Sequence, residues 1–274
     1  MKKIIKYLFL LTGGSFILAS CNDFLDREPL DSVTPDNFFF TENDLAAYAV
    51  KHYNFTTHEG FNAGIWRNDN ATDNQAATDY DKKWIPGQWK VPEAYDNPAS
   101  NDPWYFSAIR EANYFLETVV PRFEKGEIEG SETNIKHYIG EMYFLRAKNY
   151  LSKLETFGDF PIIKNTLPDE SVSLIQASKR EPRHKVARFI LEDLDLAIGL
   201  LTNTISGGKN RITKNAALLL KSRAALYEAS WLTYHKGTAL VPGGPGWPGK
   251  AEDIADFNID TEIAFFLKEA KAAA

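Results

Sequence analysis

The 274-residue sequence predicts an all-α protein, a tetratricopeptide-like helical repeat scaffold with long loop insertions. Three observations lead to this fold class. Apolar residues recur at helical spacing in several segments, two of these segments share a pattern of Arg, Ala and Tyr, and the stretches between segments are rich in Gly, Pro, Asn and Asp. Helix pairs that repeat in this way stack into an α-solenoid.

The central element is a long helix predicted within 140–157, whose apolar residues cover more than one face. These residues are Met142, Tyr143, Leu145, Ala147, Tyr150, Leu151, Leu154 and Phe157. Gly158 supplies a left-handed residue after the last turn, and Pro161 prevents the helix from continuing. We therefore expect the helix to end near Phe157 and the chain to leave it extended.

Arg146 lies on this apolar surface, where an unpaired guanidinium would be costly, so we expect a carboxylate or several carbonyls to contact it. The same pattern of Arg, Ala and Tyr occurs twice, 77 residues apart. Arg146, Ala147 and Tyr150 correspond to Arg223, Ala224 and Tyr227. Small residues at matched positions let helices approach closely. The offset far exceeds the ~34 residues of a tetratricopeptide unit, so long insertions must separate the repeats.

The N-terminus reads as an export signal. Lys2, Lys3 and Lys6 precede an apolar run over 7–18, which is too short to cross ~30 Å of hydrocarbon. Residues 18–21, Leu-Ala-Ser-Cys, match a bacterial lipobox. We therefore interpret 1–20 as a lipoprotein signal peptide and Cys21, the single cysteine, as the lipidated residue. A single cysteine also excludes an internal disulfide.

The mature chain divides into an acidic tether over 21–33 and a helical domain over 34–274. Removing the three signal lysines leaves 28 basic against 37 acidic residues, so the net charge falls from −6 to −9. This charge argues against nucleic acid as a partner. Several acyl chains on Cys21 would hold the protein on a membrane without a spanning helix.

The other helices are read in chain order. Thr34-Pro35-Asp36 opens a helix whose core face holds Phe38, Leu45, Tyr48 and Tyr53. A second helix runs from Pro103 to Val120 and is ended by Pro121. Asn113 within it is expected to bond to neighbouring backbone. Residues 121–136 are predicted to be a polar connection.

Beyond the central helix, 164–182 reads as a polar connector. A helix follows over 186–201, closed by Gly207-Gly208, and its inward residues are Phe189, Ile190, Leu194, Ile198 and Leu201. Thr213 caps a helix that runs to about Trp231, and 241–249 is an irregular loop. A last helix begins near Thr261.

Residues 60–103 lack helical or strand periodicity but are rich in aromatic and polar side chains. Four of the six tryptophans fall within 66–104. Sugar rings stack on indole and phenol, and their hydroxyls bond to planar amides, carboxylates and guanidinium groups. The candidate ligand-binding residues are Trp66, Arg67, Asp69, Asp73, Asn74, Trp84, Trp89 and Tyr95. The alternative is that these tryptophans merely pin a long insertion to the helices.

Catalysis is a weaker interpretation. The paired carboxylates Asp69 with Asp73, or Glu192 with Asp195, have the spacing of ordinary solvated charges. The sequence has neither HExxH nor a nucleophile elbow, and its five histidines lack metal-ligand spacing. We therefore expect no enzyme activity, no metal and no cofactor. A peptide- or protein-binding helical-repeat scaffold is the alternative to a glycan-binding protein.

Four segments together resemble a known family. They are Cys21 with the following NDFLDREP, the helix segment 109–113, the central stretch 140–163, and 211–231. In this order they resemble the N-terminal half of the SusD/RagB-like nutrient-binding lipoproteins of the Bacteroidota outer membrane. The resemblance implies a tetratricopeptide-like scaffold on the cell surface that captures oligosaccharides, or in some branches other nutrients. It also implies delivery to a SusC-like TonB-dependent transporter, with sugar contacts in the region that corresponds to 66–104.

The end of the chain carries one more expectation. Ile263, Phe266, Leu267 and Ala270 form an apolar face in the last predicted helix, and no return helix follows to cover it. We expect the sequence to be truncated at its C-terminus, at roughly half of the family's usual length.

Overall fold

The computed structural model describes residues 38–53, 55, 104–204 and 210–274. Within these ranges the secondary structure is helical, with two isolated β-bridges and no strand. The all-α prediction is confirmed. The α-helices are α2 (Glu42–Lys51), α4 (Ser107–Glu124), α5 (Glu132–Phe157), α6 (Ser171–Ala177), α7 (Arg183–Leu200), α8 (Lys214–Tyr234) and α9 (Ile259–Ala273), and the 3-10 helix η4 spans Ala251–Ile254.

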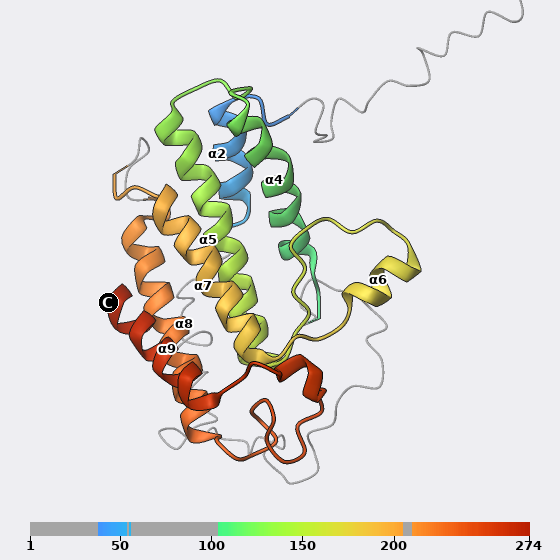
Figure 1. Cartoon of the computed structure of the whole chain (residues 1–274). Helices are drawn as coiled ribbons and strands as arrows, with labels where there is room; N and C mark the ends of the chain where they lie inside the picture. The colour runs from blue at the N-terminus through green and yellow to red at the C-terminus, as the bar shows by residue number, and fades with distance from the viewer. Residues whose placement is uncertain (1–37, 54, 56–103, 205–209) are drawn as a thin grey trace, which may run out of the picture. The chain divides into compact units, whose positions relative to one another are not determined.

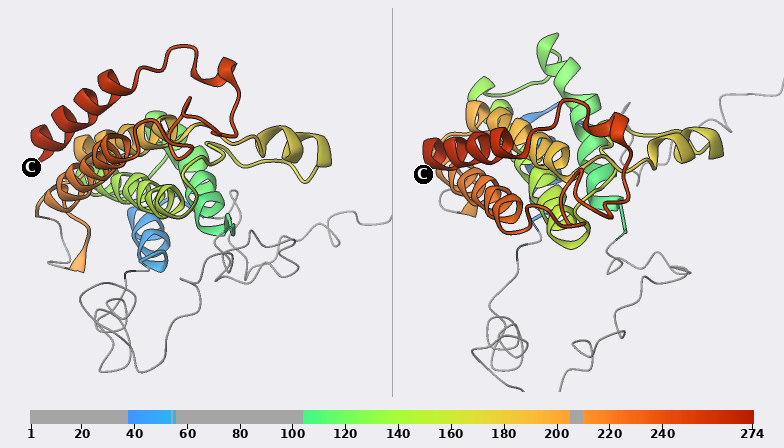
Figure 2. Two further views of the ribbon diagram at one scale, coloured as in Figure 1. Left: turned by 90° about the horizontal axis from the view of Figure 1, so that it is seen from below. Right: turned by 60° about the horizontal axis from the view of Figure 1, so that its bottom comes forward.

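Helix α5 is the centre of the unit Phe39–Ala274. Helices α2, α4 and α7 pack on α5, α8 packs on α7, and α9 packs on α8 (Figures 1 and 2). As residue numbers rise along α5, the numbers of their contacts in or just after α7 fall. His137 contacts Thr202, Arg146 contacts Asp193, and Tyr150 contacts Phe189. The two helices are therefore antiparallel, as in a tetratricopeptide-like hairpin.

Helix α5 ends where the sequence predicts. Its last residue is Phe157, and Gly158 follows with φ 71° and ψ −99°. A positive φ of this kind favours glycine. The helix begins at Glu132, so the predicted connection over 121–136 is shorter than expected.

The predicted end of the preceding helix at Val120 is wrong. Helix α4 starts at Ser107, continues through Pro121 and ends at Glu124. Proline removes one N–H donor, and so close to the end of a helix that loss costs a single backbone bond. The carbonyl of Pro121 still accepts from the amide of Lys125, and Gly126 ends the turn at φ 71°.

Three helices begin at side-chain caps. Thr213 accepts from the amide of Ala216, as predicted. Asn258 caps α9, which begins at Ile259, two residues before the predicted start. Thr41 and Asp44 form a capping box at α2. The predicted cap at Thr34-Pro35-Asp36 lies outside the described residues.

The connector over 164–182 contains an element that the sequence analysis missed. Helix α6 has no buried residue and lies apart from the packed helices (Figure 2). Helix α7 starts at Arg183 and ends at Leu200, before Gly207-Gly208, which lie outside the described residues. The loop after α8 is irregular, as predicted.

The repeated Arg motif is equivalent only in part. Arg146 is buried and meets a carboxylate, as predicted, whereas Arg223 is exposed. Ala147 and Ala224 are both buried, which fits close helix approach at the two sites.

The apolar face of α9 is better covered than expected. Phe266 and Ala270 are buried, and α9 packs extensively on α8. Leu267 of the predicted face is 47% exposed. Separately, none of the helices in the described ranges combines the length and apolarity needed to cross a membrane.

Candidate functional site

Four helix ends meet at one end of the packed helices. The amino ends of α4 and α7 lie there with the carboxyl ends of α5 and α8. Lys153 of α5 donates to the carbonyl of Tyr105 at 3.1 Å, and Arg183 of α7 donates to Glu228 of α8 at 2.8 Å. Chain segments enter and leave the helices at this end, so it carries the irregular backbone in which binding sites commonly form.

A cluster of four aromatic rings forms a ridge at this end. The buried Phe160 stacks on Phe106 and Phe157 at 5.1 Å and 5.6 Å between ring centroids. Trp104 lies 4.2 Å from Phe157 and 5.5 Å from Phe160. Backbone bonds of 3.1 Å in both directions between Phe160 and Glu181 hold the ridge to the start of α7.

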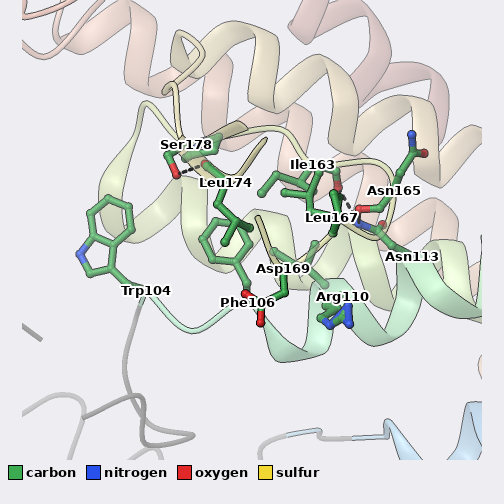
Figure 3. Close-up of a pocket in the computed structure, with 13 residues that line it drawn as sticks. Trp104, Phe106, Arg110, Asn113, Ile163, Asn165, Leu167, Asp169, Leu174 and Ser178 are labelled. Atoms are coloured by element: carbon green, nitrogen blue, oxygen red, sulfur yellow. Dashed lines mark hydrogen bonds between the residues drawn. The ribbon is translucent and has the colours of Figure 1, made fainter. Parts of the chain in front are cut away.

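A pocket of about 560 Å³ opens on one side of this ridge, between α4 and α6 (Figure 3). We call it the α4–α6 pocket. Its apolar lining includes Trp104, Phe106, Ile109, Pro161, Ile163, Leu167, Pro168 and Leu174. Its polar lining comprises Arg110, Asn113, Asn165, Asp169 and Ser178. The volume and the predominantly apolar lining are typical of small-ligand sites.

Hydrogen bonds hold the back wall of the α4–α6 pocket in place. The Asn113 side-chain amide donates to the backbone carbonyls of Ile163 and Asn165 at 2.8 Å and 3.2 Å. The prediction that Asn113 bonds to backbone is confirmed. Tyr150 donates through its hydroxyl to the Ile163 carbonyl at 3.1 Å and accepts from the Ile163 amide at 2.8 Å. The extended segment that leaves α5 is thereby fixed against α4.

The same wall is anchored to α7 by a buried ion pair. Arg146 donates to both carboxylate oxygens of Asp193 at 2.7 Å and to the Asn113 side-chain oxygen at 2.9 Å. Burial raises the pKa of Asp193, and the Arg146 guanidinium opposes that rise. The guanidinium thus joins α4, α5 and α7 behind the pocket.

Three polar side chains at the α4–α6 pocket are available to form hydrogen bonds with a ligand. Within the described ranges, the side chains of Arg110, Asn165 and Asp169 make no hydrogen bond or ion pair. Figure 3 labels all three among the residues that line the pocket. A guanidinium, an amide and a carboxylate beside an apolar lining can meet both the hydroxyls and the C–H face of a sugar.

The predicted ligand residues are untested by this geometry. Trp66, Arg67, Asp69, Asp73, Asn74, Trp84, Trp89 and Tyr95 lie outside the described residues, as does Cys21. Trp104, which closes the tryptophan-rich region, belongs to the ridge. Sequence reasoning missed Phe106, Arg110 and Asp169, because one reads as the start of a helix and the others as surface charges.

The carboxylates considered for catalysis on α7 are ordinary surface groups. Glu192 lies 3.6 Å from Lys164, and Asp195 lies 2.6 Å from Lys221. The two therefore serve different ion pairs. Within the described residues, no group of His, Cys, Asp and Glu side chains is arranged to hold a metal ion.

The fold and the pocket define a tetratricopeptide-like helical scaffold with a ligand-sized site at one end of its helices. Residues 23–226 match the SusD-like family described as starch-binding and associating with the outer membrane. The chain belongs to this SusD-like family.

Two relatives and one solved structure illustrate the similarity. Two SusD-like proteins of Formosa agariphila are 27% and 26% identical over 258 and 231 residues, which are 92% and 81% of this chain and 45% and 42% of those proteins. The crystal structure of a SusD-like protein from Bacteroides fragilis is 25% identical, with a TM-score of 0.56 over 75% of this chain and 38% of that one. This chain thus spans about half the length of the curated relatives that it matches.

Proposed function

We propose that this protein binds a glycan at the cell surface and that the α4–α6 pocket is part of the binding site. The observation that carries the proposal is the set of unpaired planar groups, Arg110, Asn165 and Asp169, around an apolar lining. Membership of a family described as starch-binding supports a saccharide over other small ligands.

The region 66–104 is proposed as the second part of this site. Its candidate residues are Trp66, Arg67, Asp69, Asp73, Asn74, Trp84, Trp89 and Tyr95. Trp104, at its end, lines the α4–α6 pocket, so the chain passes directly from this region into the pocket wall. Stacking rings from the region would add to the polar contacts of Arg110 and Asp169.

Anchoring and delivery complete the proposal. Cys21 is acylated and becomes the N-terminus after cleavage behind residue 20, and the acidic tether over 21–33 links it to the helical domain. The bound oligosaccharide then passes to a SusC-like TonB-dependent transporter. The family's described association with the outer membrane supports this placement. The protein's part is capture without catalysis, and no cofactor is needed.

One experiment tests the binding site. An array of oligosaccharides, with a peptide library beside it, identifies the ligand class, and calorimetry measures affinity for the bound glycan. Arg110→Ala should weaken binding by about tenfold, equivalent to ~1.4 kcal/mol, without lowering the melting temperature. Arg223→Ala is the matched control, because Arg223 is exposed on α8 and lines no pocket described above.

Two results would contradict the proposal. If the protein binds peptides and no glycan on the array, it is a peptide-binding scaffold. If Arg110→Ala and Arg223→Ala bind the glycan as tightly as the unmodified protein, the site lies elsewhere on the molecule.

A further inference from the structure

A second pocket, of about 340 Å³, lies on the other side of the aromatic ridge. We call it the α5–α8 pocket. The end of α5, the end of α8 and the loop over 238–248 line it, and we call that loop the tryptophan loop. Phe157, Asp159, Arg180, Trp231 and Trp247 are among its lining residues. Its volume falls within the range of small-ligand sites.

The two pockets are neighbours because two chain segments line both. The stretch that leaves α5 lines the α5–α8 pocket through 154–159 and the α4–α6 pocket at Pro161 and Ile163. The stretch before α7 contributes Ser178 to one pocket and Arg180 to the other. The Arg180 guanidinium lies 4.6 Å above the Trp104 ring, so these two side chains form the boundary between the pockets.

Trp247 supplies an aromatic ring to this pocket, and Gly249 lies against its six-membered ring. Trp231 is covered, with the Arg183 guanidinium 4.2 Å from its ring and His235 at 4.3 Å. The half-buried Trp247 ring has no ring or cation partner in the described part of the chain. Indole faces of this kind stack against the C–H face of sugars.

Hydrogen bonds fix the position of the Trp247 ring. Asp159 accepts from the indole N–H of Trp247 at 2.8 Å through one oxygen and from the Arg183 amide at 2.8 Å through the other. Trp231 donates its indole N–H to the carbonyl of Leu240 at 3.0 Å. The tryptophan loop is therefore tied to the ends of both α5 and α8, which orders the ring before any ligand binds.

Two planar charged groups line the same pocket as Trp247. Glu155 and Arg180 are exposed, and within the described residues neither forms an ion pair or hydrogen bond through its side chain. A carboxylate and a guanidinium can each take two hydroxyls of a sugar. Because the Trp247 indole lines the same pocket, the pocket carries both kinds of group that a saccharide needs.

We propose that the α5–α8 pocket is a second saccharide subsite and that one oligosaccharide fills both pockets across the Trp104–Arg180 boundary. This rests on the proposed glycan-binding function. The ligand is then an oligosaccharide long enough to span the ridge, and Asp159 is a positioning residue that acts through Trp247. Short fragments of the same glycan fill one pocket alone.

The test uses the full chain and the glycan ladder that the array selects, from disaccharide to heptasaccharide. Affinity should rise with length until both pockets are filled. Trp247→Ala should remove the extra affinity of the long members, about tenfold, and leave that of the shortest unchanged. Tyr234→Ala is the matched control, since Tyr234 is an exposed aromatic residue at the end of α8 and lines neither pocket.

Asp159 provides an independent check. Trp247→Phe keeps a ring but loses the N–H donor, and Asp159→Ala loses the acceptor. If Asp159 acts through Trp247, the double variant should weaken long-ligand binding no more than the stronger single variant does. Additive losses would show that Asp159 does not act through Trp247.

Failure of this inference is distinct from failure of the proposed function. If Arg110→Ala weakens binding while Trp247→Ala leaves the whole ladder unchanged, the α5–α8 pocket is no subsite but the glycan-binding proposal stands. If no oligosaccharide on the array binds the unmodified protein, the proposed function itself is wrong.

Discussion

At the scale of single residues, Arg146 shows what composition and context predict. An arginine on an apolar helix face requires a buried acceptor, and Asp193 with Asn113 meets that requirement. The carboxylate that pairs with Arg146 could not be predicted. Asp193 is 47 residues away, and nothing in the sequence distinguishes it from its exposed neighbours Glu192 and Asp195. Tertiary packing selects among them.

Replacing Asp193 tests the ion pair. Asp193→Ala should lower the free energy of unfolding by about 3–5 kcal/mol, because it leaves the Arg146 guanidinium buried without a counter-charge. Glu192→Ala, one residue away and exposed, should change it by about 0.5 kcal/mol or less. Urea denaturation measures both. Equal effects from the two variants would refute a structural role for the buried pair.

A second residue-scale prediction concerns pH. Burial lowers the pKa of His184 to about 4, from about 6.5 in the unfolded chain. Between these values the unfolded state binds more protons, so stability falls as pH drops from about 6.5 to about 4. His184→Gln should reduce this loss by up to about 3 kcal/mol, measured by urea denaturation at several pH values. If the free energy of unfolding falls equally with pH in the variant and the unmodified protein, the lowered pKa of His184 is contradicted.

At the scale of elements, helix ends with strong local signals were predictable and weaker ones were not. Gly158 and Thr213 mark their helix ends correctly, since each provides a local backbone or capping preference. Pro121 was misread because the penalty for proline depends on its distance from the end of the helix. Helix α6 escaped notice because it buries no side chain and so leaves no apolar periodicity.

A pair of glycines tests how closely α5 and α7 pack. A methyl group on Gly140 would lie 3.0 Å from Leu201 and 3.3 Å from the Ala197 carbonyl, whereas one on Gly199 meets nothing within 4 Å. Gly140→Ala should therefore destabilise the protein by about 1–3 kcal/mol. Gly199→Ala in the exposed last turn of α7 should stabilise it by about 0.5–1 kcal/mol through helix propensity. Thermal melting measures both, and the same sign for both would contradict the packing described.

At the scale of the whole molecule, the fold class and family were predictable, whereas the pocket was not. Helical periodicity and the Arg-Ala-Tyr repeat lie within continuous segments, so sequence patterns reveal them. The α4–α6 pocket joins residues from α4, the exit of α5 and α6, and their proximity depends on the packing of helices that are distant in sequence.

The proposed membrane anchor is also tested on the whole protein. Cys21→Ala should abolish fatty-acid labelling and shift the protein out of the detergent phase, because Cys21 is the single cysteine and the sole proposed site of acylation. Cys21→Ser serves as a second variant of similar size. Continued labelling of either variant would refute the lipoprotein assignment.

Hydrogen exchange on the full chain, with and without a saturating oligosaccharide from the array, tests the central claim most directly. A ligand in the α4–α6 pocket should slow amide exchange over 104–113 and 161–169, which line it, and leave α9 unchanged. Protection confined to α8 and α9, with no change around Arg110 and Asn165, would contradict the claim.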